Sequence, residues 1–118
     1  KHFNAIGELN VFEGARVIEK SKLVVTGDTG MMHIAAALRK NIISLWGCTT
    51  PSLGMSVYRG ANESNNSIRT LSIQSLRTLR PCSKLGNRCK YGMNNKCIDV
   101  INSTDVYQAI LNLQKEVL

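Results

Sequence analysis

The sequence predicts an α/β fold, a Rossmann-like three-layer arrangement with a parallel sheet between helices. Two short apolar segments, residues 22–26 (KLVVT) and 42–46 (IISLW), have the composition that is typical of buried parallel strands. The segment between them, residues 31–40, has the length of a short helix. A strand, a helix and a second strand joined by short turns form a right-handed crossover, so both strands should run parallel in one sheet.

The chain has the length and composition of a single folded domain. It contains 118 residues, of which 43% are hydrophobic, which suits a buried core and excludes a disordered chain. No segment approaches the roughly 20 apolar residues that a membrane-spanning helix needs. The chain begins at Lys1 rather than at a methionine, and its first residues resemble the end of an element. We therefore expect residues 1–118 to be one domain of a longer protein, incomplete at its N-terminus.

An amphipathic helix is predicted before the first strand. Asn10 is followed three residues later by Glu13, the pattern of a capping box. Apolar residues then recur at i, i+4 and i+7 from Val11, which predicts about three turns that end near Lys20.

The helix between the two strands and the elements after them are predicted from composition. Residues 31–40 are apolar nearly all round, so this helix should lie against the sheet, with Asn41 as its C-terminal cap. Residues 47–67 are rich in loop-forming residues, and residues 68–73 predict another short strand. Residues 103–118 predict a final helix capped by Asn102 or Ser103. Its apolar face is expected to pack on the core; it consists of Val106, Ile110, Leu113 and Val117.

The turn between the first strand and the following helix is the strongest candidate for a binding site. Ligands of open parallel sheets bind at the carboxyl ends of the strands, and this loop lies there. The first amides of a helix lack internal partners and carry the positive end of the helix dipole, which suits a phosphate. Gly30 would let a ligand approach the backbone, Thr29 adds a hydroxyl donor, and His33 lies in the first turn.

Asp28 needs a different role, because a carboxylate repels phosphate. It is suited to accepting hydrogen bonds from sugar hydroxyls, or to holding the loop together. Each residue also has a purely structural explanation: Asp28 or Thr29 as a helix cap, Gly30 as a tight turn, and His33 as a core histidine. Their occurrence together on one strand-to-helix turn favours a site for a nucleotide or another phosphate compound.

The residues of this turn and its surroundings resemble glycosyltransferase family 9. The segment DTGMMHIAAALRKNIISLWGCTTP is similar to the family signature, in which D-[ST]-G-x-x-H is followed by a strand and a G-x-T-x-P loop. The preceding AIGELNVFEGARVIEKSKLVVTGD and the later RPCSKLGNRCKYGMNNKCIDVI also resemble family segments. The resemblance thus extends over nearly the whole chain.

This resemblance implies the C-terminal, donor-binding half of a GT-B fold. Family members transfer heptose from a nucleotide diphosphate sugar, such as ADP-heptose, to the lipopolysaccharide core, with inversion and without a metal or other cofactor. By position, Asp28, Thr29 and Gly30 would contact the donor sugar and diphosphate, and His33 would stabilise phosphate charge. The family's general base lies on the N-terminal domain, so this chain would hold no catalytic residue and be inactive alone.

A second loop at the same edge departs from the family pattern. Thr49 and Thr50 are candidates for lining the donor site. Cys48 stands where the family usually has proline, and residues 57–58 (VY) stand where a Gly-Pro pair is common. These changes leave the identity of the donor sugar open.

The cysteines allow three interpretations. Zinc could bind Cys82, Cys89 and Cys97, with Cys48 as a further ligand, because three thiols occur within a short segment. Their spacing is not that of a zinc ribbon, which favours reduced thiols that bind no metal. A disulfide is a third interpretation, and the sequence does not select a pairing.

The formal charge of +7 is concentrated in one basic segment without acidic residues. It contains Arg69, Arg77, Arg80, Lys84, Arg88, Lys90 and Lys96. We expect this segment to orient the protein toward an anionic membrane or a phosphorylated acceptor, as a cytoplasmic protein at the inner face of the inner membrane. A solvated loop is the plainer explanation. Nucleic-acid binding is disfavoured, because grooves for single strands interleave aromatic residues and this segment has one tyrosine.

Three functions remain open from these observations. The first is the donor-binding domain of an inverting glycosyltransferase. The second is a non-catalytic module for nucleotides or phosphosugars on the same scaffold, since a fold does not fix a function. The third is a basic nucleic-acid-binding domain.

Overall fold

The computed structural model describes residues 1–60, 68–76, 80–82, 84–85, 89, 92 and 97–117. Its longer elements, in chain order, are α1 (Val11–Lys20), β1 (Leu23–Gly27), α2 (Gly30–Ala37), β2 (Asn41–Trp46), β3 (Thr70–Gln74) and α3 (Ser103–Val117). Two short 3-10 turns, η1 (Pro51–Leu53) and η2 (Ile98–Val100), follow β2 and precede α3.

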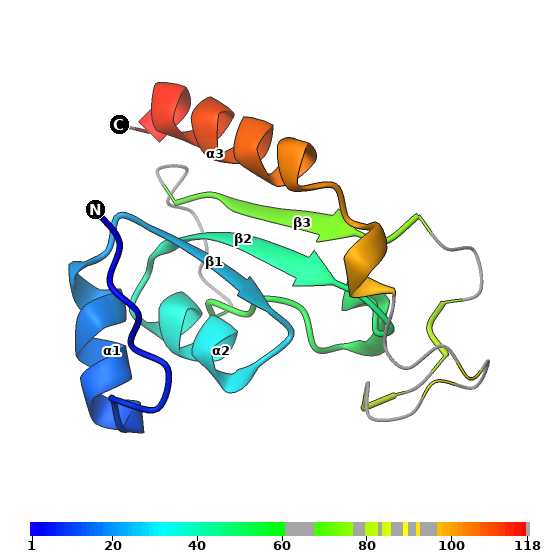
Figure 1. Cartoon of the computed structure of the whole chain (residues 1–118), viewed down its shortest axis with the longest axis horizontal. Coiled ribbons are helices and arrows are strands. Elements are labelled where there is room, and N and C mark those ends of the chain that lie inside the picture. Colours follow the sequence, from blue (N-terminus) through cyan, green and yellow to red (C-terminus); the bar gives the residue numbers. More distant parts are fainter. Residues whose placement is uncertain are drawn as a thin grey trace.

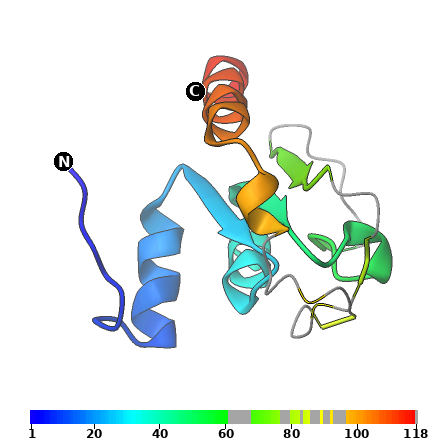
Figure 2. The same ribbon diagram turned by 45° about the vertical axis from the view of Figure 1, so that its right-hand side comes forward.

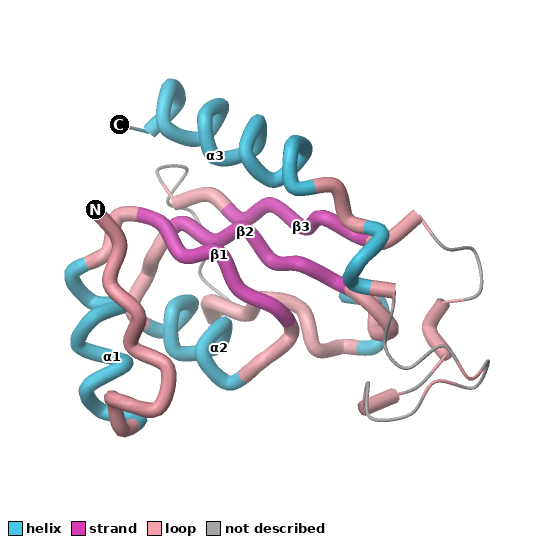
Figure 3. Tube along the Cα trace, viewed as in Figure 1, coloured by secondary structure: helices cyan, strands magenta, loops and turns pink. Residues whose placement is uncertain are grey.

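The three strands form one parallel sheet in the order β1-β2-β3. Val24 is paired with Ile42, and Ile42 is in turn paired with Thr70. In Figure 1, α1 and α2 lie below the sheet and α3 lies above it. Figure 2 and Figure 3 show the same three layers. The parallel pairing of β1 and β2 confirms the predicted unit, and the strand boundaries lie within two residues of the predicted ones. The prediction that residues 22–26 form a buried strand is wrong, because β1 lies at the edge of the sheet and contains no buried residue.

The capping box at the start of α1 is present as predicted. The Asn10 side chain accepts hydrogen bonds from the backbone N–H groups of Phe12 and Glu13, at 2.9 and 3.0 Å. The Glu13 carboxylate accepts a hydrogen bond from the Asn10 N–H at 2.8 Å. Three amide groups at the start of the helix are thereby satisfied, and α1 extends to Lys20.

The core lies between α2 and β2. Met32, Ala35 and Ala36 of α2 pack against Ile42 and Trp46, and each of these side chains is at most 1% exposed. Two alanines on the inner face of α2 allow the helix to approach the sheet closely. This packing confirms that the apolar segment after β1 is a helix lying against the sheet.

The end of α2 differs from the prediction. The helix ends at Ala37, and Arg39 takes a left-handed backbone conformation with φ of 56°. Arg39 N–H then donates to Ala36 O, and Lys40 N–H to Ala35 O, each at 3.0 Å, which is the bonding of a Schellman motif. The predicted cap at Asn41 is therefore wrong.

Asn41 is the first residue of β2 and links the three strands. Its side-chain amide donates to Lys22 O at 3.3 Å, and its side-chain oxygen accepts from the Arg69 N–H at 2.9 Å. The side chain thus pairs with the segments just before β1 and just before β3, and this explains an asparagine at the start of a buried strand.

The final helix α3 begins as predicted. The Asn102 side chain accepts a hydrogen bond from the Thr104 N–H at 2.9 Å, so Asn102 is the cap. Leu113 is buried and Val106 and Ile110 are half-buried, which confirms a core-facing side; the side chain of Val117 lies outside the described residues. No helix in the described ranges is long and apolar enough to span a membrane.

The capping box provides a first test of this fold. We expect Asn10→Ala to lower the free energy of unfolding by about 1 kcal/mol, because it removes the acceptor for two amides. Urea denaturation of the chain followed by circular dichroism would measure the change. Asn10→Asp keeps an acceptor and should stay within about 0.5 kcal/mol of the parent. Equal loss in both variants would contradict this role for Asn10.

Candidate functional site

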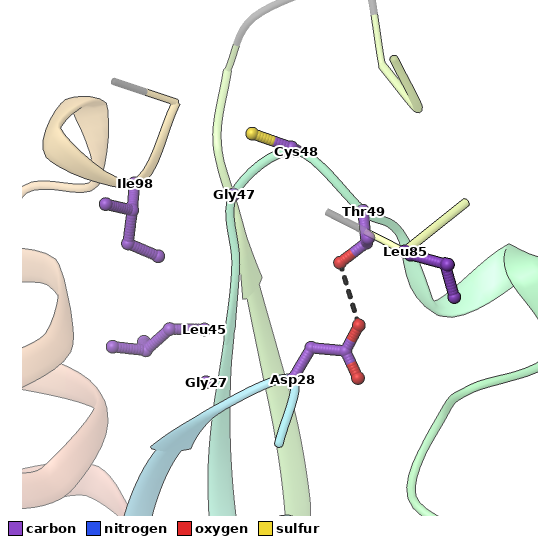
Figure 4. Close-up of a pocket in the computed structure, with 8 residues that line it drawn as sticks. All are labelled: Gly27, Asp28, Leu45, Gly47, Cys48, Thr49, Leu85 and Ile98. Atoms are coloured by element: carbon purple, nitrogen blue, oxygen red, sulfur yellow. Dashed lines mark hydrogen bonds between the residues drawn. The ribbon is translucent and has the colours of Figure 1, made fainter. Parts of the chain in front are cut away.

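A pocket lies at the carboxyl edge of the sheet, where β1 and β2 end. Its cavity measures about 230 Å³. It is lined by Gly27, Asp28, Leu45, Gly47, Cys48, Thr49, Leu85 and Ile98 (Figure 4). Parallel α/β sheets place ligands at this edge. The cavity is smaller than the roughly 300–1,000 Å³ of a typical ligand site, so it suits one chemical group of a larger ligand.

Asp28 and Thr49 meet at this pocket. The Thr49 hydroxyl donates a hydrogen bond of 2.9 Å to the Asp28 carboxylate (Figure 4). The bond joins the loop after β1 to the loop after β2, and Thr49 is only 5% exposed. Within the described part of the chain, Asp28 has no other side-chain hydrogen bond. Its second carboxylate oxygen is therefore available to accept hydrogen bonds from a ligand.

The start of α2 lies directly beside Asp28 and is open. Thr29 occupies the cap position, but its side chain makes no capping hydrogen bond; its hydroxyl lies 3.2 Å from that of Thr26. Gly30 has no left-handed φ, and a Cβ added there would meet nothing within 4 Å. Neither backbone geometry nor packing requires a glycine at this position. The open space and the uncapped amides leave room for an anion.

His33 lies on the exposed side of α2. The explanation of His33 as a core histidine therefore fails. The pocket lining does not include Thr29, Gly30 or His33. The structure thus places Asp28 and Thr49 in the pocket, and Thr29, Gly30 and His33 on the open surface at the start of α2.

Thr50 does not line the pocket. Its side chain is buried at 8% exposure, and its hydroxyl lies 2.6 Å from that of Ser52. The pair lies at the start of η1, where it stabilises the turn after the second loop. The structure therefore gives Thr50 a local structural contact and gives Thr49 the contact with Asp28.

Arg80 holds the second loop in place, a role that the sequence did not indicate. Its guanidinium donates to the backbone oxygens of Gly47 and Thr49, each at 3.3 Å. The sequence suggests a surface cation, because Arg80 belongs to the basic segment. Nothing in its neighbours along the chain predicts that the loop carbonyls lie within its reach.

Gly47 lies close to η2. A Cβ at Gly47 would lie 3.2 Å from the backbone nitrogen of Ile98. The absence of a side chain therefore lets the segment before α3 pack on the pocket wall. Ile98 and Leu85, which line the pocket, were not identified from the sequence because only this tertiary packing brings them there.

Most of the basic segment lies outside the described residues, namely Arg77, Arg88, Lys90 and Lys96. Arg69 and Lys84 are exposed, whereas Arg80 is half-buried. The membrane-facing role of this segment stays a prediction.

The cysteines gather around Cys48. Cys48 and Cys97 are buried, at 7% and 5% exposure, and Cys82 is half-buried. Burial raises the pKa of the Cys48 thiol to about 12, and hydrogen bonds and charge from Cys97 and Cys82 add to the rise. Within the described ranges, which include all four cysteines, no three His, Cys, Asp or Glu side chains are arranged to hold a metal ion. The zinc hypothesis for Cys82, Cys89 and Cys97 has no support from this geometry.

Comparison with known proteins identifies a family for most of the chain. The sequence profile of glycosyltransferase family 9 (heptosyltransferase) matches residues 1–85. The match ends within the cysteine-containing segment, after Cys82, and does not reach α3, so it is shorter than the resemblance seen in the sequence. No solved structure matches the chain.

Three curated relatives illustrate the similarity. The chain is 44% identical over 48 residues to lipooligosaccharide heptosyltransferase 2 of Haemophilus influenzae, which is 41% of this chain and 14% of that protein. It is 38% identical over 48 residues to lipopolysaccharide heptosyltransferase 2 of Escherichia coli, with the same shares of both chains. It is also 38% identical over 52 residues to lipopolysaccharide heptosyltransferase 1 of Salmonella typhimurium, or 44% of this chain and 16% of that protein. The matches therefore span only about a seventh of these relatives.

Two glycines at this edge should respond oppositely to a methyl group. Gly47→Ala should lower the free energy of unfolding by about 1–3 kcal/mol, because its Cβ would crowd the backbone at Ile98. Gly30→Ala should leave stability unchanged or raise it by up to about 1 kcal/mol, because alanine favours a helix and the space is open. Urea denaturation measures both, and similar destabilisation by the two variants would contradict the described packing.

Proposed function

The chain belongs to glycosyltransferase family 9, the heptosyltransferase family, and from this premise we propose that it binds the sugar-nucleotide donor of a glycosyltransferase. The observation that carries the proposal is the Asp28 carboxylate, fixed by Thr49 at 2.9 Å beside the open start of α2. An oriented acceptor for hydroxyls next to an anion site suits a sugar joined to a diphosphate.

Each of the two parts of the site would bind a different part of the donor. The first amides of α2, near Thr29 and Gly30, would bind the diphosphate through hydrogen bonds and the helix dipole. His33, exposed on the same first turn, would add a charge-assisted hydrogen bond to phosphate. Asp28, at the pocket, would accept hydrogen bonds from hydroxyls of the donor sugar. Because negative charge grows on the departing diphosphate during transfer, the helix start and His33 would also stabilise the transition state.

The whole enzyme would transfer heptose or a related sugar from a nucleotide diphosphate to the lipopolysaccharide core, with inversion. Residues 1–118 would form the C-terminal donor domain of a GT-B fold, and the general base would lie on another domain. This chain alone would therefore bind donor without transferring it. We place the enzyme in the cytoplasm, where its basic segment would contact the anionic inner face of the membrane.

A first test of the site replaces His33. We expect His33→Ala to weaken ADP-heptose binding by about 1–3 kcal/mol, through loss of a charge-assisted hydrogen bond. Isothermal titration would measure the affinity. Stability should be unchanged, since the side chain is exposed. His2→Ala is the matched control, because His2 is the chain's other histidine and is also exposed. An affinity equal to that of the control would remove His33 from the site.

Asp28→Asn tests whether Asp28 binds the sugar of the donor and not its diphosphate. The amide keeps the size of the side chain but removes the charge and one acceptor. We expect ADP-heptose affinity to fall by about 1–3 kcal/mol, while ADP affinity stays the same or rises slightly because repulsion of phosphate is relieved. Titrations with both ligands give the comparison. An equal loss for ADP and ADP-heptose would show that Asp28 supports the loop and does not contact the sugar.

A further inference from the structure

Three cysteine side chains from distant parts of the chain gather behind the second loop of the pocket. Cys48 follows β2, Cys82 follows β3, and Cys97 immediately precedes η2. Cys97 and Cys82 both lie close enough to the Cys48 thiol to raise its pKa. Cys48 lines the pocket, and both Cys48 and Cys97 are buried in the core. The contacts proposed for the donor do not involve these thiols, and the described geometry does not form a metal site.

Cys48 and Cys82 are held together by their backbones. The Cys82 N–H donates to Cys48 O at 3.3 Å, and the Cys82 thiol lies 4.0 Å from the same oxygen. This hydrogen bond brings the backbone of Cys82 alongside that of Cys48. Because a disulfide spans Cα distances of about 4.4–6.8 Å, residues whose main chains are hydrogen-bonded to each other are candidates for one.

The three thiols differ in their access to solvent. Cys48 and Cys97 are buried, at 7% and 5% exposure, whereas Cys82 is half-buried. The raised pKa of Cys48 keeps its thiol protonated at neutral pH and therefore slow to react with an oxidant. Of these three, only Cys82 is accessible enough to meet a small oxidant in solution.

From this arrangement we propose that Cys82 and Cys48 form a peroxide-reactive pair that closes to a reversible disulfide in the wall of the pocket. The Cys82 thiolate attacks one oxygen of a hydroperoxide such as H₂O₂, which forms a sulfenic acid and releases hydroxide. The Cys48 sulfur then attacks the Cys82 sulfur, an S–S bond forms, and the sulfenic oxygen leaves as water with the Cys48 proton. Two thiols lose two electrons and two protons, and the peroxide is reduced to two waters.

The position of Cys48 links the disulfide to the pocket. The effect on donor binding that we expect from it rests on the proposed function. Cys48 lies between Gly47 and Thr49, whose carbonyls Arg80 holds, and Thr49 in turn holds Asp28. Drawing the Cys48 side chain toward Cys82 removes it from Cys97 and shifts the wall that carries Thr49. Oxidation should therefore weaken donor binding, and a dithiol reductant should restore it.

The test is disulfide mapping of the unsubstituted chain after exposure to H₂O₂. Trypsin does not cut before proline, so each cysteine falls in its own peptide: 41–59, 78–84, 89–90 and 97–115 for Cys48, Cys82, Cys89 and Cys97. Mass spectrometry without reductant should show a bond between peptides 41–59 and 78–84, lost on adding dithiothreitol. A bond from Cys48 to Cys97, an oxidised chain without a disulfide, or stoichiometric zinc that resists peroxide would each overturn the proposal.

Single cysteine variants test the same pairing in a second way. Cys82→Ser should abolish the disulfide of Cys48, and this half-buried position is the less disruptive one to change. Cys89→Ser is the matched control, also half-buried, and should keep the disulfide; Cys97→Ser should keep it too. A disulfide of Cys48 that survives in Cys82→Ser would contradict the pairing.

Donor titration separates this proposal from the proposed function. The mapped, oxidised chain should bind ADP-heptose at least threefold more weakly than the reduced chain. Equal affinity in both states would overturn the link between the disulfide and the pocket. A reduced chain that does not bind ADP-heptose at all would instead count against the proposed function, while the disulfide map would still decide whether the thiol pair exists.

Discussion

The close packing of α2 on β2 is the constraint on which the rest of the structure depends. Ala35 and Ala36 bring the helix near the sheet, and Met32 fills the space beside Ile42 and Trp46. This contact fixes β1 and β2 parallel, so that both strands end at the same edge. The loops after them are then close enough for Thr49 to donate to Asp28. A binding edge is thus a geometric consequence of a helix with small residues on its inner face.

The proposed site would combine two kinds of recognition that one chemical group cannot provide. Backbone amides at a helix start attract an anion, and a carboxylate repels one. Asp28 can stand beside the start of α2 because its charge is directed toward the pocket and held there by Thr49. In the proposed site, the separation of the carboxylate from the exposed His33 would give the edge one region for phosphate and another for hydroxyls. A sugar nucleotide has these two chemistries in sequence.

The sequence predicted the elements that local chemistry determines. The capping box at Asn10, the two parallel strands and the Asn102 cap depend on residues close together in the chain, and all are present. The end of α2 was missed because Arg39 adopts a conformation that glycine usually takes, with φ of 56°. Asp28 and Thr49 were identified as separate candidates, but their contact joins residues 21 positions apart and follows only from the sheet.

The parts of the site that sequence reasoning missed share one cause. Arg80, Leu85 and Ile98 reach the pocket from the chain beyond β3, where no regular period indicates structure. They converge on the loop after β2 because Gly47 leaves room for the backbone at Ile98 and because Arg80 bonds two of its carbonyls. The wall of the pocket is therefore built from the segment around the cysteines. That segment therefore contacts the loop that carries Thr49, whose hydroxyl positions the carboxylate of Asp28.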